Sequence, residues 1–314
     1  MASIHIARLA EPGEDVGPEH FAFSHDTGQA EPGEGHVLVR VEAVSVNPVD
    51  RMLATRRFAE GLGLTPPVTA GGDFVGTVVE RGAGVDRLRP GRRVFGQASV
   101  LQGGSGSLAS FVVARADRTA RIDDDVADEQ AAALPLAGST ALQALETLAL
   151  QEGQKLLVLG AGGAVGSLAV QIALARGVRV VATAAGDDDA YPRSLGVKDV
   201  RDYADPAWAE GLAGFDGVLD ASPASEREQR AALGSLRRGG TAVSLLAEPH
   251  ASLADELGVR AVRQRTEPTV QRLKELAALA EAGTLRSRIA AAFELEDGAD
   301  ALTARGRGKV IVTL

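Results

Sequence analysis

Residues 156–171 read LLVLGAGGAVGSLAVQ, and this stretch decides the fold. Its apolar opening is typical of a buried strand, and a glycine-rich turn follows at Gly160, Gly162 and Gly163. Glycine permits positive φ and lets the backbone approach a ligand closely, while Gly166 lets the next helix pack tightly on the strand. The order strand, glycine turn, helix predicts a pyrophosphate site at the helix N-terminus. The alternative is a tight turn that binds nothing.

The glycine turn opens a stretch in which strands and helices are expected to alternate. Two helices precede it, one at 128–134 that Pro135 breaks and one at 138–150. Parallel strands connected by helices form a sheet covered on both faces, so this stretch predicts a doubly wound α/β sheet. The expected strands are 155–159, 178–183, 217–220 and 241–245, with helices at 166–176 and 226–236 between them.

The first third of the chain reads as β-structure. Residues 34–46 alternate apolar and polar side chains, and Asn47-Pro48 ends this strand because proline lacks a backbone donor. Short strands separated by Gly and Pro predict a compact barrel or sandwich. Further strands are expected at 73–80, 91–96, 109–114 and 309–314, with helices at 50–58 and 269–282.

The chain is long enough for two domains. It has 314 residues, 45% of them hydrophobic, and a single core stops growing at roughly 250–300 residues. We expect a β-rich catalytic domain at 1–122, completed by 259–314, and a dinucleotide-binding domain at 123–258.

Charge and cysteine content exclude several classes of protein. The chain has 33 basic and 42 acidic side chains, for a net charge of -9, which argues against binding to nucleic acid. It has no cysteine, which excludes disulfides, thiolate metal sites and a cysteine nucleophile. Residues 1–10 do not resemble a signal peptide, and the apolar runs are too short to span a bilayer. We expect a cytoplasmic protein that binds neither nucleic acid nor membrane.

The end of the second central strand bears on the choice of cofactor. NAD-binding sites usually carry an acid there, about 20 residues beyond the glycines, and residues 180–185 read VVATAA with none. The space is open to a 2′-phosphate, which Arg193 could reach. However, Asp187, Asp188 and Asp189 follow and would repel a phosphate, unless they form a solvated helix start. We expect NADPH, with NADH as the alternative.

An ordered set of motifs resembles the medium-chain dehydrogenase/reductase superfamily, in its zinc-free quinone oxidoreductase branch. The resemblance implies a GroES-like β-barrel domain, then a Rossmann domain, with the C-terminal segment returning to the first domain. Besides the glycine turn, the matching segments are Asn47-Pro48-Val49-Asp50, 67–84, 131–141, 218–222, 236–240 and 306–310.

The resemblance also implies a reaction. Zinc-dependent relatives carry a cysteine near Asn47 and a His-Glu pair near Gly72-Asp73, and this chain carries neither the cysteine nor the histidine. We therefore expect no metal, and a hydride passing from NADPH to a quinone or an α,β-unsaturated carbonyl. No proton donor is evident, because relatives that reduce enoyl thioesters often carry a tyrosine where this chain has Arg56-Arg57-Phe58.

Site residues are expected in both domains. Asn47 and Asp50 are the candidate catalytic residues. Asn47 either donates to a carbonyl or the nicotinamide or caps the turn before Pro48, and Asp50 either orients a partner or holds the short helix. Lys309 either reaches the cofactor or is an exposed strand charge. The expected cofactor-binding residues are Thr140, Gly160, Ala161, Gly162, Gly163, Ala164, Val165, Thr183, Ala184, Arg193, Ala221, Ser222, Leu245 and Lys309.

Other functions and assemblies stay open on this evidence. The alternatives are a specialised biosynthetic enoyl or enone reductase, and a cofactor-binding sensor or scaffold with little catalysis. We expect a homodimer, because an exposed sheet edge at 241–245 could pair across a two-fold axis.

Overall fold

The computed structural model describes residues 1–25 and 31–314, which fold as two compact units. The expected boundaries at 122 and 258 lie before the observed ones. Helix α3 (Asp128–Ala132) packs on strands of the first unit, and strand β14 (Arg260–Arg263) completes the sheet of the second. The first unit is Met1–Leu136, Pro268–Gly283 and Ile289–Leu314, and the second is Ala137–Glu267 and Thr284–Arg288.

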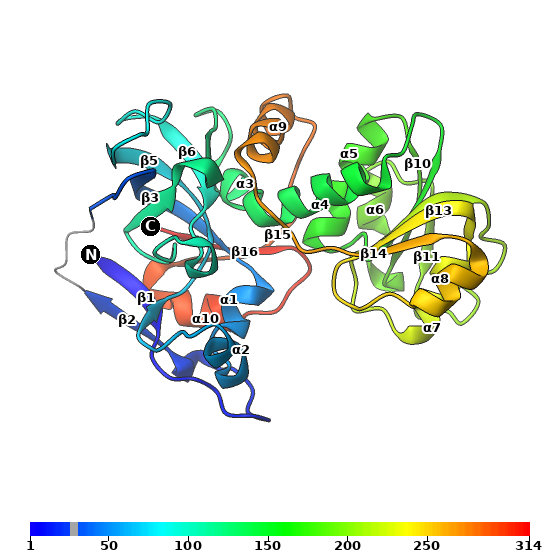
Figure 1. Cartoon of the computed structure of the whole chain (residues 1–314), viewed down its shortest axis with the longest axis horizontal. Helices are drawn as coiled ribbons and strands as arrows, with labels where there is room; N and C mark the ends of the chain where they lie inside the picture. Colours follow the sequence, from blue (N-terminus) through cyan, green and yellow to red (C-terminus); the bar gives the residue numbers. More distant parts are fainter. Residues whose placement is uncertain (26–30) are drawn as a thin grey trace. The chain divides into compact units, whose positions relative to one another are not determined.

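The second unit contains a six-stranded parallel sheet in the order β11-β10-β9-β12-β13-β14. The chain enters at the central strand β9, winds outward to β11, then starts again at β12 and winds outward to β14. Parallel strands that are added in two directions from the centre put helices on both faces, the doubly wound architecture expected from the sequence. Figure 1 shows α5 and α6 on one side of the sheet and α7 and α8 on the other. The elements are α4 (Pro135–Leu148), β9 (Lys155–Leu159), α5 (Ala164–Ala175), β10 (Arg179–Ala184), α6 (Ala190–Ser194), β11 (Asp199–Asp202), β12 (Phe215–Asp220), α7 (Glu226–Gly234), β13 (Leu236–Ser244), α8 (Ala251–Leu257) and β14 (Arg260–Arg263).

The central strand β9 explains why this sheet is so apolar in sequence. Leu156, Leu157 and Val158 are all fully buried, although consecutive side chains of a strand point to opposite faces. Both faces are therefore covered, and an uninterrupted apolar run is the pattern that such a strand requires.

The expected sheet edge at 241–245 is wrong. Residues 241–244 fall in β13, which hydrogen-bonds to β12 on one side and to β14 on the other. The sheet ends instead at β11 and β14. Strand β14 reads RAVR, which is too short and too basic to be recognised from alternation. Because β14 covers β13, the reason given for a homodimer no longer holds.

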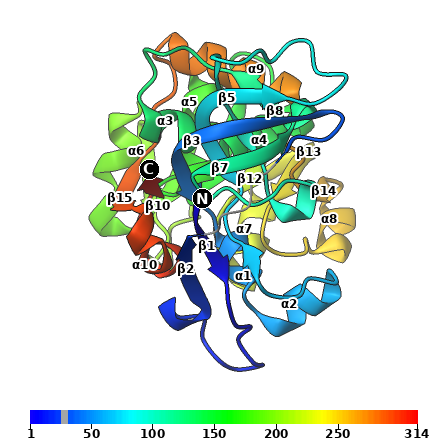
Figure 2. The same ribbon diagram turned by 90° about the vertical axis from the view of Figure 1, so that its left-hand side faces the viewer.

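The first unit is built on a seven-stranded sheet whose path runs β15-β16-β3-β5-β6-β8, with β7 also paired to β3. Figure 2 shows β3 and β7 side by side. The C-terminal strand β16 pairs with β3, so the C-terminal segment returns to this sheet, whereas the N-terminal strand β1 pairs with β2 and β4 in a separate three-stranded sheet. The elements are β1 (Ala2–Ile6), β2 (Phe21–His25), β3 (His36–Val46), α1 (Pro48–Met52), α2 (Arg56–Gly61), β4 (Val68–Thr69), β5 (Asp73–Arg81), β6 (Arg93–Gln97), β7 (Phe111–Arg115), β8 (Thr119–Arg121), α3 (Asp128–Ala132), α9 (Val270–Glu281), β15 (Ile289–Glu294), α10 (Gly298–Thr303) and β16 (Lys309–Thr313).

The structure has three helices that the sequence analysis did not name, α6, α8 and α10, and it differs from expectation at two of the expected helices. The single helix expected within 50–58 is two short helices, α1 and α2. Pro135, expected to break a helix, also begins the next one, α4, because the first helical residue needs no backbone N–H donor. Among the residues that the structure describes, no helix has the length and hydropathy to cross a bilayer.

The pairing of β16 with β3 predicts a large cost for truncating its core. Ile311 is fully buried and lies opposite Ser45 of β3. The substitution Ile311→Ala should lower the free energy of unfolding by about 2–5 kcal/mol, because it removes buried methyl groups and leaves a cavity. Val79→Ala is the control, since Val79 lies exposed on β5 and should change stability by about 0.5 kcal/mol or less. Chemical denaturation followed by circular dichroism compares the two, and equal effects would contradict the packing described.

Candidate active site

A buried carboxylate, that of Asp73 at the start of β5, is the centre of a polar cluster in the first unit. Its Oδ1 accepts hydrogen bonds from Gln97 Nε2 at 2.6 Å and from the backbone N–H of Leu136 at 3.0 Å. Its Oδ2 accepts from Ser45 Oγ at 3.1 Å, Asn47 Nδ2 at 2.9 Å and Lys309 Nζ at 3.4 Å. Five donors from four segments therefore compensate the loss of water around one buried charge.

Asn47 and Lys309 are brought together by this carboxylate. The Lys309 ammonium donates to Asn47 Oδ1 at 2.6 Å, to the Val46 carbonyl at 3.3 Å and to Asp73. Asn47 is thus held with its oxygen toward the ammonium and its NH₂ toward the carboxylate. The interpretation of Lys309 as an exposed strand charge is wrong, because the side chain is 4% exposed and three acceptors surround it. Burial lowers the pKa of this ammonium, and the Asp73 and Asp50 carboxylates oppose that shift.

Asp50 lies in α1, one turn after Asn47, and is also buried. Its Oδ2 accepts the backbone N–H of Asn47 at 2.7 Å, so the side chain holds the start of the short helix. Its Oδ1 has no hydrogen-bond partner among the described residues. Burial raises the pKa of Asp50 to about 7, with the Asp73 carboxylate adding to the shift and Lys309 opposing it. The group is therefore poised to gain or lose a proton near neutral pH.

The glycine turn of the second unit has the geometry that the sequence indicates. Gly160 has φ of 81°, and its N–H donates to Thr183 Oγ1 at 3.2 Å, while the N–H of Ala161 donates to the Thr183 carbonyl at 3.0 Å. A Cβ on Gly166 would meet the Gly160 carbonyl oxygen far inside van der Waals contact, so α5 packs on the turn only with glycine there. Gly163 is the N-cap of α5, and Ala164 and Val165 are its first helical residues.

The other expected cofactor residues of this unit surround the ends of the central strands. Ala184 ends β10, and Ala221 follows β12, with its N–H on the Leu159 carbonyl at 3.1 Å. Ser222 donates to Asp220 Oδ1 at 3.1 Å, and the N–H of Leu245 donates to the Asp220 carbonyl at 3.0 Å. Thr140 lies on α4, where its hydroxyl is 2.8 Å from Thr266 Oγ1.

Arg193, the residue expected to reach a 2′-phosphate, is bonded within its own neighbourhood. Its Nε donates to Asp189 Oδ2 at 3.0 Å, one turn earlier in the chain. Its Nη1 donates to the Lys198 carbonyl at 3.0 Å. A second arginine, Arg288, binds Asp188 instead. The reading of the three aspartates as a solvated helix start does not hold for Asp188, which is buried.

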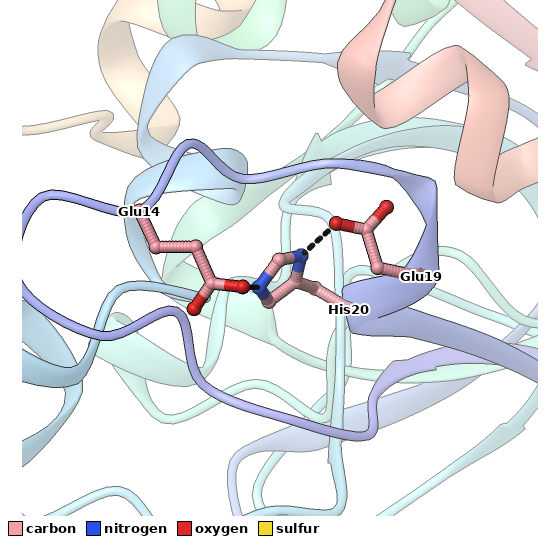
Figure 3. Close-up of side chains that lie close together, drawn as sticks. All are labelled: Glu14, Glu19 and His20. Carbon is pink, nitrogen blue, oxygen red and sulfur yellow. Dashed lines mark ion pairs between the residues drawn. The ribbon is translucent and has the colours of Figure 1, made fainter.

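A cluster of Glu14, Glu19 and His20 lies in the N-terminal segment (Figure 3). His20 is fully buried, with Nε2 at 3.4 Å from Glu14 Oε1 and Nδ1 at 3.3 Å from Glu19 Oε1. The two carboxylates thus approach different ring nitrogens, which one metal ion cannot bind together. Glu14 also binds the Arg8 guanidinium with both oxygens. We interpret this cluster as an ion-pair network.

Sequence reasoning left out four residues that the structure places at these sites. Asp73 and Asp220 both stand in motifs of the family resemblance, and that signal could have singled them out. Asp188 was considered only as a charge, and Arg288 lies in no motif, so its position next to the glycine turn carried no signal in the sequence.

Two family models match the chain. Residues 33–124 match the model described as "Alcohol dehydrogenase GroES-like domain", and residues 195–312 match "Zinc-binding dehydrogenase".

Several curated proteins are similar in sequence. Polyketide synthase GfsB of Streptomyces halstedii is 38% identical over 299 residues, which cover 90% of this chain and 5% of that protein. The chloroplast envelope quinone oxidoreductase homolog of Arabidopsis thaliana is 38% identical over 184 residues, 57% of this chain and 55% of that protein. The mitochondrial NAD(P)H oxidoreductase RTN4IP1 of Mus musculus is 30% identical over 327 residues, 88% of this chain and 81% of that protein. The chain thus spans about half of the plant relative and a small part of the polyketide synthase.

Solved structures share the whole fold. The quinone oxidoreductase of Coxiella burnetii is 26% identical with a TM-score of 0.87, and the match covers 100% of this chain and 99% of that chain. A mycobacterial protein, Rv1454c complexed with NADPH, is 26% identical with a TM-score of 0.84, and the match covers 100% of both chains.

The pKa of Asp50 predicts a pH-dependent stability. In the unfolded chain this carboxyl should titrate near its usual value of about 3.9, whereas in the folded chain its pKa is about 7. Between these values the folded state binds the extra proton, so the contribution of Asp50 to stability falls as pH rises, by up to about 1.4 kcal/mol per unit. Asp50→Asn should remove this slope in denaturation measured from pH 4 to 8. The fully exposed Asp86→Asn is the control and should leave the slope unchanged. An identical slope in wild type and Asp50→Asn would contradict the buried protonated carboxyl.

The Lys309–Asp73 pair predicts strong coupling. The substitution Lys309→Met leaves a buried carboxylate without its cation and should destabilise the protein by about 3–5 kcal/mol. Adding Asp73→Asn to Lys309→Met should recover part of that loss, because the uncompensated charge is gone. Lys274→Met on the exposed side of α9 is the control. Additive effects of the two substitutions in denaturation would show that the pair is not coupled.

Proposed function

This chain belongs to the medium-chain dehydrogenase/reductase superfamily, in its quinone oxidoreductase-like branch, and on that premise we propose an NADPH-dependent, zinc-independent reductase of quinones or α,β-unsaturated carbonyls. An oxidoreductase that uses a nicotinamide cofactor and a small-molecule substrate is the coarser statement that the relatives support. NADPH, zinc independence and the acceptor class are the finer parts of the proposal.

The glycine turn suits a dinucleotide. The first N–H groups of α5 have no partner within the helix, and the helix dipole favours a phosphate there. A Cβ on Gly163 would meet only the Gly160 carbonyl oxygen, at 3.4 Å, so the N-cap of α5 lies open on its other sides. Residues of the turn and of the strand ends, among them Thr183, Ala184, Ala221, Ser222 and Leu245, are proposed to hold the cofactor. When bound, the nicotinamide supplies a hydride.

The observation that carries the proposal of zinc independence is the ammonium of Lys309. Zinc-dependent relatives place ligands near the positions of Asn47 and Asp73, and here Asn47 Oδ1 and Asp73 Oδ2 both accept hydrogen bonds from Lys309. A resident cation of the protein thus already binds both of these oxygens. A conjugated carbonyl is already electrophilic enough to accept a hydride, whereas oxidation of a simple alcohol benefits from a metal-bound alkoxide. The proposed substrate therefore fits a site without a Lewis acid.

Asn47 and Asp50 have distinct proposed tasks in this site. Asn47 is held at both ends of its amide, so any hydrogen bond that it shares with a carbonyl or the nicotinamide is orientated in advance. Asp50 is fully buried and bonded to the backbone of Asn47, which favours a positioning role over direct contact with substrate.

A second candidate function is an enoyl reductase for thioester-bound substrates. It is favoured by the similarity to a polyketide synthase along 90% of this chain. The two candidates differ in the acceptor and share the transfer of a hydride to a conjugated carbonyl system.

The proposed function predicts NADPH oxidation, followed by absorbance, with at least one acceptor in a panel of quinones, enones and enoyl thioesters. Turnover should be unchanged by metal chelators. Gly166→Ala should weaken NADPH binding because the added methyl displaces the turn, whereas Gly234→Ala at the open end of α7 should not. Binding of NADPH without turnover across the whole panel would instead favour a sensor or scaffold.

A further inference from the structure

An ion pair lies directly against the glycine turn. The Arg288 guanidinium binds the Asp188 carboxylate with two hydrogen bonds, from Nη1 to Oδ2 at 2.7 Å and from Nη2 to Oδ1 at 2.8 Å. Nη1 is also 3.4 Å from the carbonyl oxygen of Gly162, the second glycine of the turn. A Cβ on Gly162 would lie 2.5 Å from Asp188 Oδ2, so the carboxylate has taken the space that glycine leaves.

Aromatic and polar neighbours fix the guanidinium in this place. Its Cζ lies 4.3 Å from the centroid of the Tyr191 ring, a stacking distance at which the ring attracts a cation. Tyr191 in turn hydrogen-bonds to Ser167 in the first turn of α5. The Asp188 side chain is 8% exposed, whereas that of Arg288 is 25% exposed. The arginine is therefore the member of the pair that is accessible to a ligand.

The position of this ion pair in the fold bears on the choice between NADH and NADPH. Asp188 follows the end of β10, about 20 residues beyond the glycine turn, where dinucleotide sites read the adenosine ribose. An acid at that place accepts hydrogen bonds from the ribose hydroxyls of NADH, and an arginine near it binds the 2′-phosphate of NADPH. This chain has both groups at that place, and each is the other's partner.

We propose that Arg288 is the residue that selects NADPH by binding its 2′-phosphate, and that Asp188 competes with the phosphate for the same guanidinium. A guanidinium binds carboxylate and phosphate with the same planar fork, so a doubly charged phosphate can replace the carboxylate. Asp188 then holds Arg288 over the turn when no phosphate is present, at the cost of affinity for NADPH. This inference rests on the proposed nicotinamide cofactor.

The charges around the pair agree with an exchange of partners. Asp189, the third carboxylate of the run Asp187-Asp188-Asp189, is paired with Arg193, so it adds little to the repulsion of a phosphate. Arg286 is a further cation close enough to Tyr191 to influence its ionisation.

Dissociation constants for NADPH and NADH, measured by titration calorimetry, test the proposal. Arg288→Gln should weaken NADPH about 10-fold or more, because the 2′-phosphate loses its guanidinium partner, and it should not weaken NADH, which has no such phosphate. Asp188→Asn should tighten NADPH about 10-fold, because the charged competitor for the guanidinium is removed. It should weaken NADH, because a neutral amide accepts hydrogen bonds from the ribose hydroxyls less strongly than a carboxylate does. The matched control is the neighbouring pair, with Arg193→Gln and Asp189→Asn, which should leave the ratio of the two constants within about twofold of wild type.

A further variant and two probe ligands complete the test. Arg288→Lys keeps the positive charge without the planar bidentate donor arrangement of the guanidinium, so it should bind NADPH with intermediate affinity. This variant replaces Arg288→Gln in the test if Arg288→Gln does not fold. The probes 2′,5′-ADP and 5′-AMP isolate the 2′-phosphate, and Arg288→Gln should weaken only the first. An unchanged ratio of NADPH to NADH affinity in the Arg288 variants would overturn the inference and leave the proposed function standing. A wild-type protein that binds neither nucleotide would overturn both.

Discussion

The carboxylate of Asp73 is the constraint on which the first unit depends. An isolated charge in a protein interior is costly, and this one is buried without direct access to water. Its compensation comes from Ser45 and Asn47 around the end of β3, from Gln97 on β6, from Leu136 at the start of α4 and from Lys309 on β16. These segments must be assembled at the same time for the charge to be tolerated. The cluster therefore couples the order of the polar site to the folding of the whole unit.

The same cluster links stability to the proposed chemistry. Removal of water around Asn47 strengthens each hydrogen bond that fixes its amide, because the local dielectric is low. That environment also penalises a second negative charge, which is why Asp50 holds its proton to a higher pH than an exposed carboxyl would. With Lys309 positive, Asp73 negative and Asp50 protonated, the cluster is neutral. Loss of the Asp50 proton would leave a net negative charge beside the residue proposed to orient the substrate.

Local sequence signals predicted the layout of the second unit and failed where partners are distant in sequence. The apolar run of β9 and the glycine turn after it carry their structure in consecutive residues, so the parallel sheet was predictable. Strand β14 was missed because its four residues include two arginines and its identity comes from pairing with β13. The partner of Lys309 lies 236 residues away and that of Arg288 lies 100 residues away. No spacing rule reaches across such distances, which explains why neither contact was expected.

Both of these distant partnerships use the same part of the chain. Arg288 and Lys309 lie in the C-terminal segment. Each supplies the cation for a buried carboxylate much earlier in the sequence, Asp188 in the second unit and Asp73 in the first. The two ion pairs differ in how far the cation is exposed to solvent. Lys309 is enclosed and has three acceptors of the protein, so its charge serves the fold and the orientation of Asn47. Arg288 is partly exposed and rests on an aromatic face, so its carboxylate partner can be exchanged for a ligand. Burial therefore separates the structural cation from the one proposed to recognise a substrate group.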